Sequence, residues 1–188
     1  SGWSFNVPTQ DLYDSYDVTD TRRGVAILDI EAWAESTGAE YSKGYEHTGY
    51  FNHKYIPRAG LSGAQQELNY GINFRAIRYA DVLLMAAEAN NRKSSANDTK
   101  AQNYLNQVRA RAFAGGSNAS SSIGPVLTKE IWDERRLELA MEGHRFFDLV
   151  RTGEAAATIA GFVTGKHEVF PIPQTEIDIS GLTQNSGY

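Results

Sequence analysis

The sequence predicts a mainly α-helical protein with irregular loops, short strands and a tetratricopeptide-like αα-hairpin. Two segments with helical periodicity flank a short polar turn, and a long charged helix follows them. The first third is rich in tyrosine, glycine and asparagine and lacks helical periodicity. A chain of 188 residues suits a single domain, 1–188. Within it we distinguish a loop-rich, aromatic segment (1–72) from a helical scaffold with an extended C-terminal tail (73–188).

The predicted αα-hairpin consists of helices at 73–92 and 99–112. Small residues such as Ala80 and Ala87 in the first helix would let a neighbouring helix approach closely. Thr99 could cap the second helix in a capping box with Gln102. The apolar positions of the second helix are Ala101, Tyr104, Leu105, Val108 and Ala112. No second copy of this hairpin appears at the repeat period of about 34 residues. We therefore expect only a fragment of a helical superhelix, with irregular structure around it.

Shorter elements are predicted around this hairpin. A helix starts near Pro8, and the β-branched run at 25–30 has the length of a strand. Alternating residues and glycines at 41–57 predict a hairpin whose last strand is 53–56. The prolines of 169–177 predict an extended tail.

The helix predicted at 131–151 carries charges of both signs among large apolar residues. Thr128 is its predicted N-cap, and Gly143 with His144 could break it before a separate short helix at 146–151. At about 100° per residue, five charged side chains fall within an arc of about 100°. They are Glu134, Arg135, Glu138, Glu142 and Arg145. The mixture predicts a helix buried on most sides, with its carboxylates paired to arginines.

The complete predicted charge network extends from this arc to the end of the charged segment. Its members are Glu134, Arg135, Arg136, Glu138, Glu142, Arg145, Asp148 and Arg151. Its arginines are predicted to clamp onto Asp81, Glu88 or Asp148. The alternative is a glycosidase acid/base pair, because carboxylates one turn apart lie roughly 5–7 Å from each other. We favour the structural interpretation, because catalytic carboxylates usually come from different elements that face a cleft.

Composition excludes several classes of function. The formal net charge is −5 and no basic patch stands out, which disfavours nucleic acid and anionic membrane surfaces as partners. Without cysteine, disulfides, zinc thiolates and thiol nucleophiles are excluded. The histidines His47 and His53 and the aspartates at 14–20 lack the spacing of metal sites. The sequence predicts no metal and no cofactor.

Motifs along nearly the whole chain resemble the SusD/RagB family. The most extensive is ERRLELAMEGHRFFDLVR at 134–151, which resembles the C-terminal signature of the family. RYADVLLMAAEA at 78–89 and NQVRARA at 106–112 are similar to its preceding helices. FPIP at 170–173 and QNSGY at 184–188 are similar to its ending, with Ser186 where proline is usual. Further similarities upstream are Gly2-Trp3, Pro8-Thr9, and Asp20 with Arg22.

This resemblance implies the C-terminal portion of a SusD-like fold and a non-enzymatic, outer-membrane lipoprotein of Bacteroidota. Such proteins bind oligosaccharides or polysaccharides at the cell surface and pass them to a SusC-like TonB-dependent transporter for nutrient uptake. Family members are more than twice as long, so a lipid anchor, the implied membrane attachment, would lie on an N-terminal part not included here. The alternative is a helical-repeat scaffold that docks the transporter without binding sugar.

The candidate ligand-binding residues are aromatic. Of the 21 aromatic residues, 12 precede Arg75, and flat rings pack against the apolar faces of sugars while polar side chains bind their hydroxyls. We predict that a glycan contacts Trp3, Trp33, Tyr41, Tyr45, Tyr50 and Tyr70. Tyr55 is a weaker candidate because it lies in the strand-like run. The alternative is that these rings fill a core beneath the loops.

Overall fold

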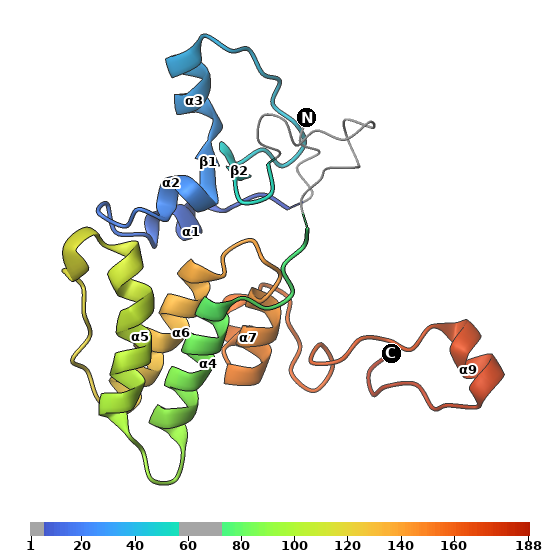
Figure 1. Ribbon diagram of the computed structural model, residues 1–188. Coiled ribbons are helices and arrows are strands. Elements are labelled where there is room, and N and C mark those ends of the chain that lie inside the picture. Colours follow the sequence, from blue (N-terminus) through green and yellow to red (C-terminus); the bar gives the residue numbers. More distant parts are fainter. Residues whose placement is uncertain (1–5, 57–72) are drawn as a thin grey trace. The chain divides into compact units, whose positions relative to one another are not determined.

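The computed structural model describes residues 6–56 and 73–188 of the chain (Figure 1). The chain divides into two compact units, residues 1–143 and 144–188. The described part is mostly helical with two short strands, so the predicted fold class is confirmed. None of the helices described is long and apolar enough to cross a membrane.

Helices α4 (Tyr79–Arg92), α5 (Asp98–Ala112) and α6 (Gly124–Glu138) form the main core of the first unit. The short connection between α4 and α5 makes them the predicted αα-hairpin, and α6 packs against both. The core of these helices consists of Leu83, Leu84, Ala87, Ala101, Leu105, Val108, Leu127 and Ile131. Each fully buried leucine or isoleucine contributes about 1.5–3 kcal/mol, so this core holds the three helices together.

The ends of these helices differ from the predictions. Helix α4 begins at Tyr79 rather than at residue 73, and Ile77 lies before it and is exposed. The capping box of Thr99 and Gln102 is wrong: Asn97 is the N-cap of α5, where its side chain accepts a hydrogen bond of 2.9 Å from the Lys100 amide.

Thr128 was also wrong as the N-cap of α6, which begins one turn earlier at Gly124 with a proline in its first turn. Thr128 lies inside the helix, where its hydroxyl donates to Asn91 of α4 at 2.5 Å. A proline at the start of a helix costs nothing because its missing N–H would have no intrahelical partner there, which favours the earlier start.

The segment before α4 contains α1 (Gln10–Asp14), α2 (Arg23–Ala26), β1 (Ile27–Asp29), α3 (Ile30–Thr37) and β2 (Tyr50–Asn52). Thr9 caps α1 by accepting from the Leu12 amide, which confirms the predicted short helix. The strands pair antiparallel, with Leu28 opposite Phe51.

Two strand predictions are therefore partly or wholly wrong. The run at 25–30 forms a strand only at Ile27–Asp29. The predicted hairpin at 41–57 is not formed among its described residues, because β2 pairs with the distant β1 instead. A helix and a loop separate the two strands, so the pairing is a tertiary contact rather than a local turn.

A second core attaches this segment to the end of α6. It consists of Tyr16, Ala26, Ile27, Tyr50 and Ala140, with Leu12, Tyr13 and Leu137 packed against it. The Tyr16 hydroxyl donates to the Leu137 carbonyl oxygen at 2.7 Å, and burial raises the pKa of Tyr16. A backbone hydrogen bond from Thr21 to Ala112 adds a link to α5. The loop-rich segment is thereby fixed on the helices.

The second unit contains α7 (Arg145–Thr152), α8 (Ala155–Thr158) and α9 (Gln174–Ser180). Helix α7 is the separate short helix predicted after the glycine, and Gly143 has the positive φ of 84° that ends the preceding turn. The predicted extended tail is wrong in part, since α9 follows Pro173. The side chain of Gln184 then bonds to both backbone groups of Ile172, at 2.8 and 2.9 Å.

Candidate functional site

The structure separates the predicted ligand-binding aromatics into exposed and buried rings. Trp33 on α3 is 43% exposed and Tyr45, in the loop after it, is 81% exposed. Tyr41 in the same loop is half-buried. Trp3 and Tyr70 lie outside the described residues. These three described rings keep the accessibility that a ligand-stacking role requires.

Tyr50 is not an accessible ring, and its prediction as a ligand contact needs correction. It is 8% exposed because it lies in β2 and its ring stacks on Tyr13 at a centroid distance of 4.5 Å. Its hydroxyl donates to the Gln10 Oε1 at 3.1 Å. Tyr50 therefore belongs to the core, which was the alternative interpretation of these aromatics. Tyr55 is half-buried and stacks on Phe74 at 6.1 Å.

Helix α3 presents Trp33 on a well-defined backbone. Asp29 caps the helix by accepting from the Ala32 amide at 3.0 Å, and Gly38 ends it in the left-handed conformation with φ 69°. The hydroxyls of Ser36 and Thr37 donate to the carbonyl oxygen of Trp33 at 2.9 and 2.8 Å. These contacts order the backbone that carries the ring, so a ligand that stacks on Trp33 does not have to order that backbone.

A polar cluster lies next to this helix. Oε1 of Glu31 accepts from the Tyr41 hydroxyl at 3.1 Å and pairs with the Lys43 ammonium at 2.9 Å. The hydrogen bonds from Lys43 and Tyr41 lower the pKa of Glu31, so the carboxylate is ionised at neutral pH. The cluster combines an anion, a cation and a hydroxyl, and the hydroxyl belongs to the aromatic ring of Tyr41. Such a set can hydrogen-bond the hydroxyls of a sugar while the rings pack against its C–H faces.

A polar cavity of about 280 Å³, which we call the His47 cavity, adjoins the cluster. Its wall consists of Gln10, Asp29, Glu31, Lys43, His47, Thr48, Gly49 and Tyr50. Residues of α1, α3, β2 and the loop that precedes β2 thus meet around one space. Neither His47 nor the cavity was predicted from the sequence. There the histidines were considered only as metal ligands, and their spacing disfavoured that role.

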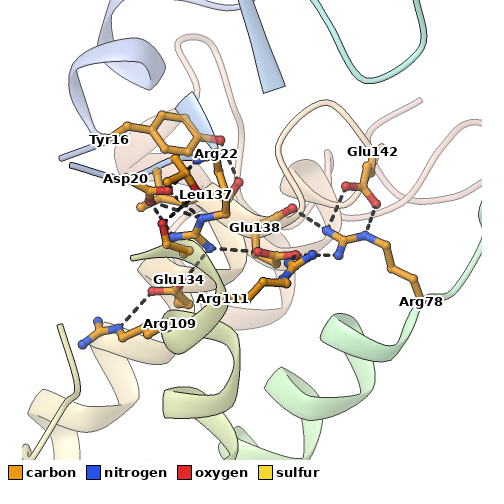
Figure 2. A network of polar contacts seen from close by, with 12 residues as sticks. Tyr16, Asp20, Arg22, Arg78, Arg109, Arg111, Glu134, Leu137, Glu138 and Glu142 are labelled. Carbon is orange, nitrogen blue, oxygen red and sulfur yellow. Dashed lines mark hydrogen bonds and ion pairs between the residues drawn. The ribbon is translucent and has the colours of Figure 1, made fainter. Parts of the chain in front are cut away.

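The predicted carboxylates around α6 form a separate, buried network (Figure 2). Glu134, Glu138 and Glu142 are 3%, 3% and 5% exposed. Glu142 lies beyond the end of the helix, so only the first two share it. Their cationic partners come from other segments of the chain, namely Arg22, Lys54, Arg78, Arg109 and Arg111.

Arg22 and Arg78 each bridge more than one carboxylate. Arg22 Nη1 lies 2.5 Å from Glu134 and 2.8 Å from Glu138, while its Nη2 pairs with Asp20 at 2.6 Å (Figure 2). Arg78 contacts Glu138 at 2.5 Å and Glu142 at 2.7 Å. Hydrogen-bonded pairing of this kind offsets the cost of removing both charges from water. The network attaches the segments before α4 to α6.

The electrostatics of this network argue against a general-acid role for Glu138 and Glu142. Burial acts to raise the pKa of Glu138, but the hydrogen bonds from Arg22 and Arg78 outweigh it and the pKa is lowered. The pKa of Glu142 is lowered in the same way, by Arg78 and Lys54. A general acid at neutral pH needs a raised pKa, so both carboxylates have the wrong protonation state for that role.

The other predicted network members divide among different contacts. Arg135 pairs with Asp81 at 2.7 Å, and both are buried. Arg151 pairs with Asp148 at 2.7 Å within α7. Arg136 contacts the exposed Asp11 instead of a predicted partner. Arg145 is wrong as a member of the arc, because the helix ends at Glu138 and Arg145 begins α7 in the second unit.

Sequence reasoning missed the main cations of the network. Arg22, Arg78 and Arg109 all lie within motifs that carry the family resemblance. Their place in these motifs indicated that the arginines matter, but it did not indicate which carboxylates they bind. Arg109 Nε contacts Glu134 at 3.0 Å from α5. These ion pairs join residues that lie 25 to 116 positions apart in the sequence. Such pairs cannot be deduced from helical spacing.

The lowered pKa values of Glu138 and Glu142 predict a loss of stability in acid. A carboxylate whose folded-state pKa is depressed stabilises the protein above its unfolded-state value of 4.5, and the contribution disappears as the pH falls through the folded-state value. We expect the free energy of unfolding to decrease steadily from about pH 5 to about pH 3. Glu138→Gln should make that decrease shallower in urea titrations at several pH values. An equal slope in both proteins would contradict this.

The fold and these contacts define a mainly helical protein with an αα-hairpin, a buried arginine–carboxylate network and an exposed aromatic segment. The chain belongs to the SusD family, whose model matches residues 29–169. It is 36% identical over 162 residues to SusD-like protein P2 of Formosa agariphila, a match that covers 80% of this chain and 32% of that protein.

Solved structures are similar over nearly the whole chain. A laminarin-binding SusD-like protein is 42% identical with a TM-score of 0.83, covering 100% of this chain and 39% of that one. Surface glycan-binding protein A from Bacteroides thetaiotaomicron, in complex with laminarihexaose, is 33% identical with a TM-score of 0.81. That match covers 98% of this chain and 42% of the solved one. The chain thus spans about two fifths of the solved relatives and a third of the curated one.

Proposed function

We propose that this chain is part of a surface glycan-binding protein and that its glycan contacts lie on α3 and the loop that follows it. The observation that carries the proposal is that α3 and the loop after it hold two large exposed rings, Trp33 and Tyr45, as well as the polar cluster of Glu31, Tyr41 and Lys43. Sugar recognition requires apolar faces and hydrogen-bonding groups side by side. The buried carboxylates, paired with arginines and with Lys54, support a scaffold rather than a catalytic role.

Laminarin is the first ligand to test. Two similar proteins are described by what they bind, one as laminarin-binding and one in complex with laminarihexaose. Because each aromatic contact contributes about 1 kcal/mol, a site of a few rings predicts weak affinity, on the order of millimolar to tens of micromolar.

Trp33→Ala should weaken the binding of laminarihexaose by about 1–2 kcal/mol, or roughly five- to thirtyfold. The free energy of unfolding should change by less than about 1 kcal/mol, because the side chain is partly exposed and a ligand-stacking ring contributes little to the core. Calorimetric titration and urea denaturation of the same variant measure both quantities.

Tyr50→Ala is the matched control. It removes a ring of the same segment that lies in the core, so we expect a loss of about 3–5 kcal/mol of stability. If Trp33→Ala behaved like this control and left the affinity for the glycan unchanged, Trp33 would be a core residue and the proposed site would be wrong.

The cellular role is a further part of the proposal. We propose that the complete protein is non-catalytic, is held at the outer membrane by a lipid anchor, and delivers glycan to a SusC-like TonB-dependent transporter. Membership of the SusD family supports this proposal. In the second candidate function, this part of the protein docks the transporter without binding sugar, and the exposed Trp33 and Tyr45 make that less favoured. Co-purification of the complete protein with the transporter, from cells grown on laminarin, tests delivery.

A further inference from the structure

A second cavity, of about 370 Å³, adjoins the buried network at Glu138, the last residue of α6. We call it the Arg75 cavity. Its wall includes five cationic side chains and two carboxylates, namely Arg22, Lys54, Arg75, Arg78, Arg111, Glu138 and Glu142. Like charges repel each other, so a gathering of cations lowers the stability of the fold unless anions offset it. A hollow with excess positive charge also concentrates anions from the solvent.

The two carboxylates of the wall do not balance its cations. Glu138 accepts hydrogen bonds from three arginines, and Glu142 accepts from Arg78 and Lys54 (Figure 2). Arg22 also pairs with Asp20, so its charge is compensated outside the cavity. The other four cations of the wall, Lys54, Arg75, Arg78 and Arg111, stand against two carboxylates, which leaves two positive charges in excess.

Three of these cations keep unused hydrogen-bond donors. Arg75 is exposed and has no hydrogen-bond or ion-pair partner in the parts of the chain that the structure describes. Arg111 bonds to Glu138 through Nη2 alone, and its side chain is 62% exposed. Lys54 uses two of its three ammonium protons, for Glu142 at 2.6 Å and for the Glu138 carbonyl oxygen at 2.8 Å. Guanidinium groups with free N–H donors bind carboxylate and sulfate oxygens, often through two parallel hydrogen bonds.

The ammonium of Lys54 is consistent with this excess of positive charge. Burial lowers the pKa of Lys54, and the neighbouring charge of Arg78 acts in the same direction. The hydrogen bond to Glu142 acts to raise the pKa but does not restore its ordinary value. The groups around the ammonium therefore stabilise its charged form incompletely, and an anion bound in the cavity would supply the missing stabilisation.

We propose that the Arg75 cavity binds the sulfate or carboxylate group of an anionic sugar. Its volume falls in the range of about 300–1,000 Å³ that is typical of pockets for small organic ligands, so it has room for a sugar ring as well as the charged group. The exposed side chain of Val25 in the same wall offers apolar surface to the C–H groups of that ring. The proposal rests on the proposed glycan-binding function and extends it to charged glycans, because laminarihexaose carries no charge.

D-Glucose 6-sulfate and D-glucuronate are suitable probes, because each carries one oxyanion on a single sugar. At constant ionic strength, at least one of them should shift the arginine Nε–Hε signals of Arg75 and Arg111 in NMR spectra, up to saturation. The signal of Arg136, which pairs with Asp11 outside the cavity, should stay in place.

The reference ligands are D-glucose and sodium sulfate. Constant signals of Arg75 with both charged sugars would overturn the proposal. Equal shifts with D-glucose would also overturn it, because the site would then not recognise the charge. Binding of sodium sulfate as tight as that of D-glucose 6-sulfate would show a site for free anions and would contradict the assignment to a sugar.

Arg75→Gln removes the unpaired cation. We expect it to weaken binding of the charged sugar at least about fivefold, as the loss of a charge-assisted hydrogen bond predicts, without lowering the melting temperature. Lys129→Gln is the matched control, because it removes one positive charge from α6 at a side chain that is 55% exposed and outside the cavity. Unchanged affinity in Arg75→Gln, or equal losses in the two variants, would overturn the site.

The same titrations separate this site from the proposed function. If the unaltered chain bound laminarihexaose but neither charged sugar, the Arg75 cavity would fail and the proposed function would stand. If a charged sugar bound through Arg75 but laminarihexaose did not bind, the Arg75 cavity would stand and the glycan site on α3 would fail.

Discussion

Arg22→Met is expected to lower the free energy of unfolding by about 3–5 kcal/mol, the usual result of removing one partner from a buried ion pair. Arg22 pairs with Asp20, Glu134 and Glu138, whose side chains are 0%, 3% and 2% exposed. Without the guanidinium these carboxylates lose a partner but cannot reach water. Urea denaturation followed by helical circular dichroism measures the effect.

Two further variants show whether the loss arises from stranded charge. Adding Asp20→Asn to Arg22→Met should restore part of the stability, because it removes one uncompensated carboxylate. Arg136→Ala is the matched control, since its partner Asp11 has a side chain that is 79% exposed and such pairs contribute about 0–1 kcal/mol. Equal losses in Arg22→Met and Arg136→Ala would contradict the buried network.

Arg135→Met is expected to have a second large effect, again about 3–5 kcal/mol. Arg135 on α6 and Asp81 on α4 are 5% and 4% exposed and pair at 2.7 Å. The substitution leaves Asp81 as a buried charge between two helices whose shared core is apolar. The midpoint of urea denaturation should fall accordingly.

The double variant Arg135→Met with Asp81→Leu distinguishes charge burial from packing. Replacing both partners of a buried pair by apolar groups is often neutral or stabilising, so the double variant should be more stable than Arg135→Met alone. If it were less stable, the contribution of Arg135 would come from packing rather than from the ion pair.

Local sequence patterns predicted the helices well because the relevant contacts are near in sequence. The apolar positions of 99–112 recur with the helical period, and Leu105, Val108 and Ala112 are buried as that period requires. The start of α4 was placed too early because apolar Phe74 and Ile77 extend the pattern, although both side chains are exposed outside the helix.

Tertiary relations could not be predicted in this way. Strand β2 pairs with β1 across a helix and a loop, and the carboxylates of α6 bind arginines on other segments. Aromatic composition also does not distinguish a core ring from a ligand contact: Tyr50 and Tyr45 lie five positions apart, yet the structure buries one and exposes the other. The wall of the His47 cavity likewise comes from four separate segments, which meet only in the folded chain.

The most direct test of the account is NMR mapping of laminarihexaose on the 188-residue chain. We expect the amide signals of α3 and of the loop before β2, including those of Trp33, Tyr45 and His47, to shift with a common saturation curve. Signals of α4, α5 and α6 should stay in place, because these helices serve as the scaffold. Shifts confined to those helices or to residues 144–188, or no shifts at all, would contradict it.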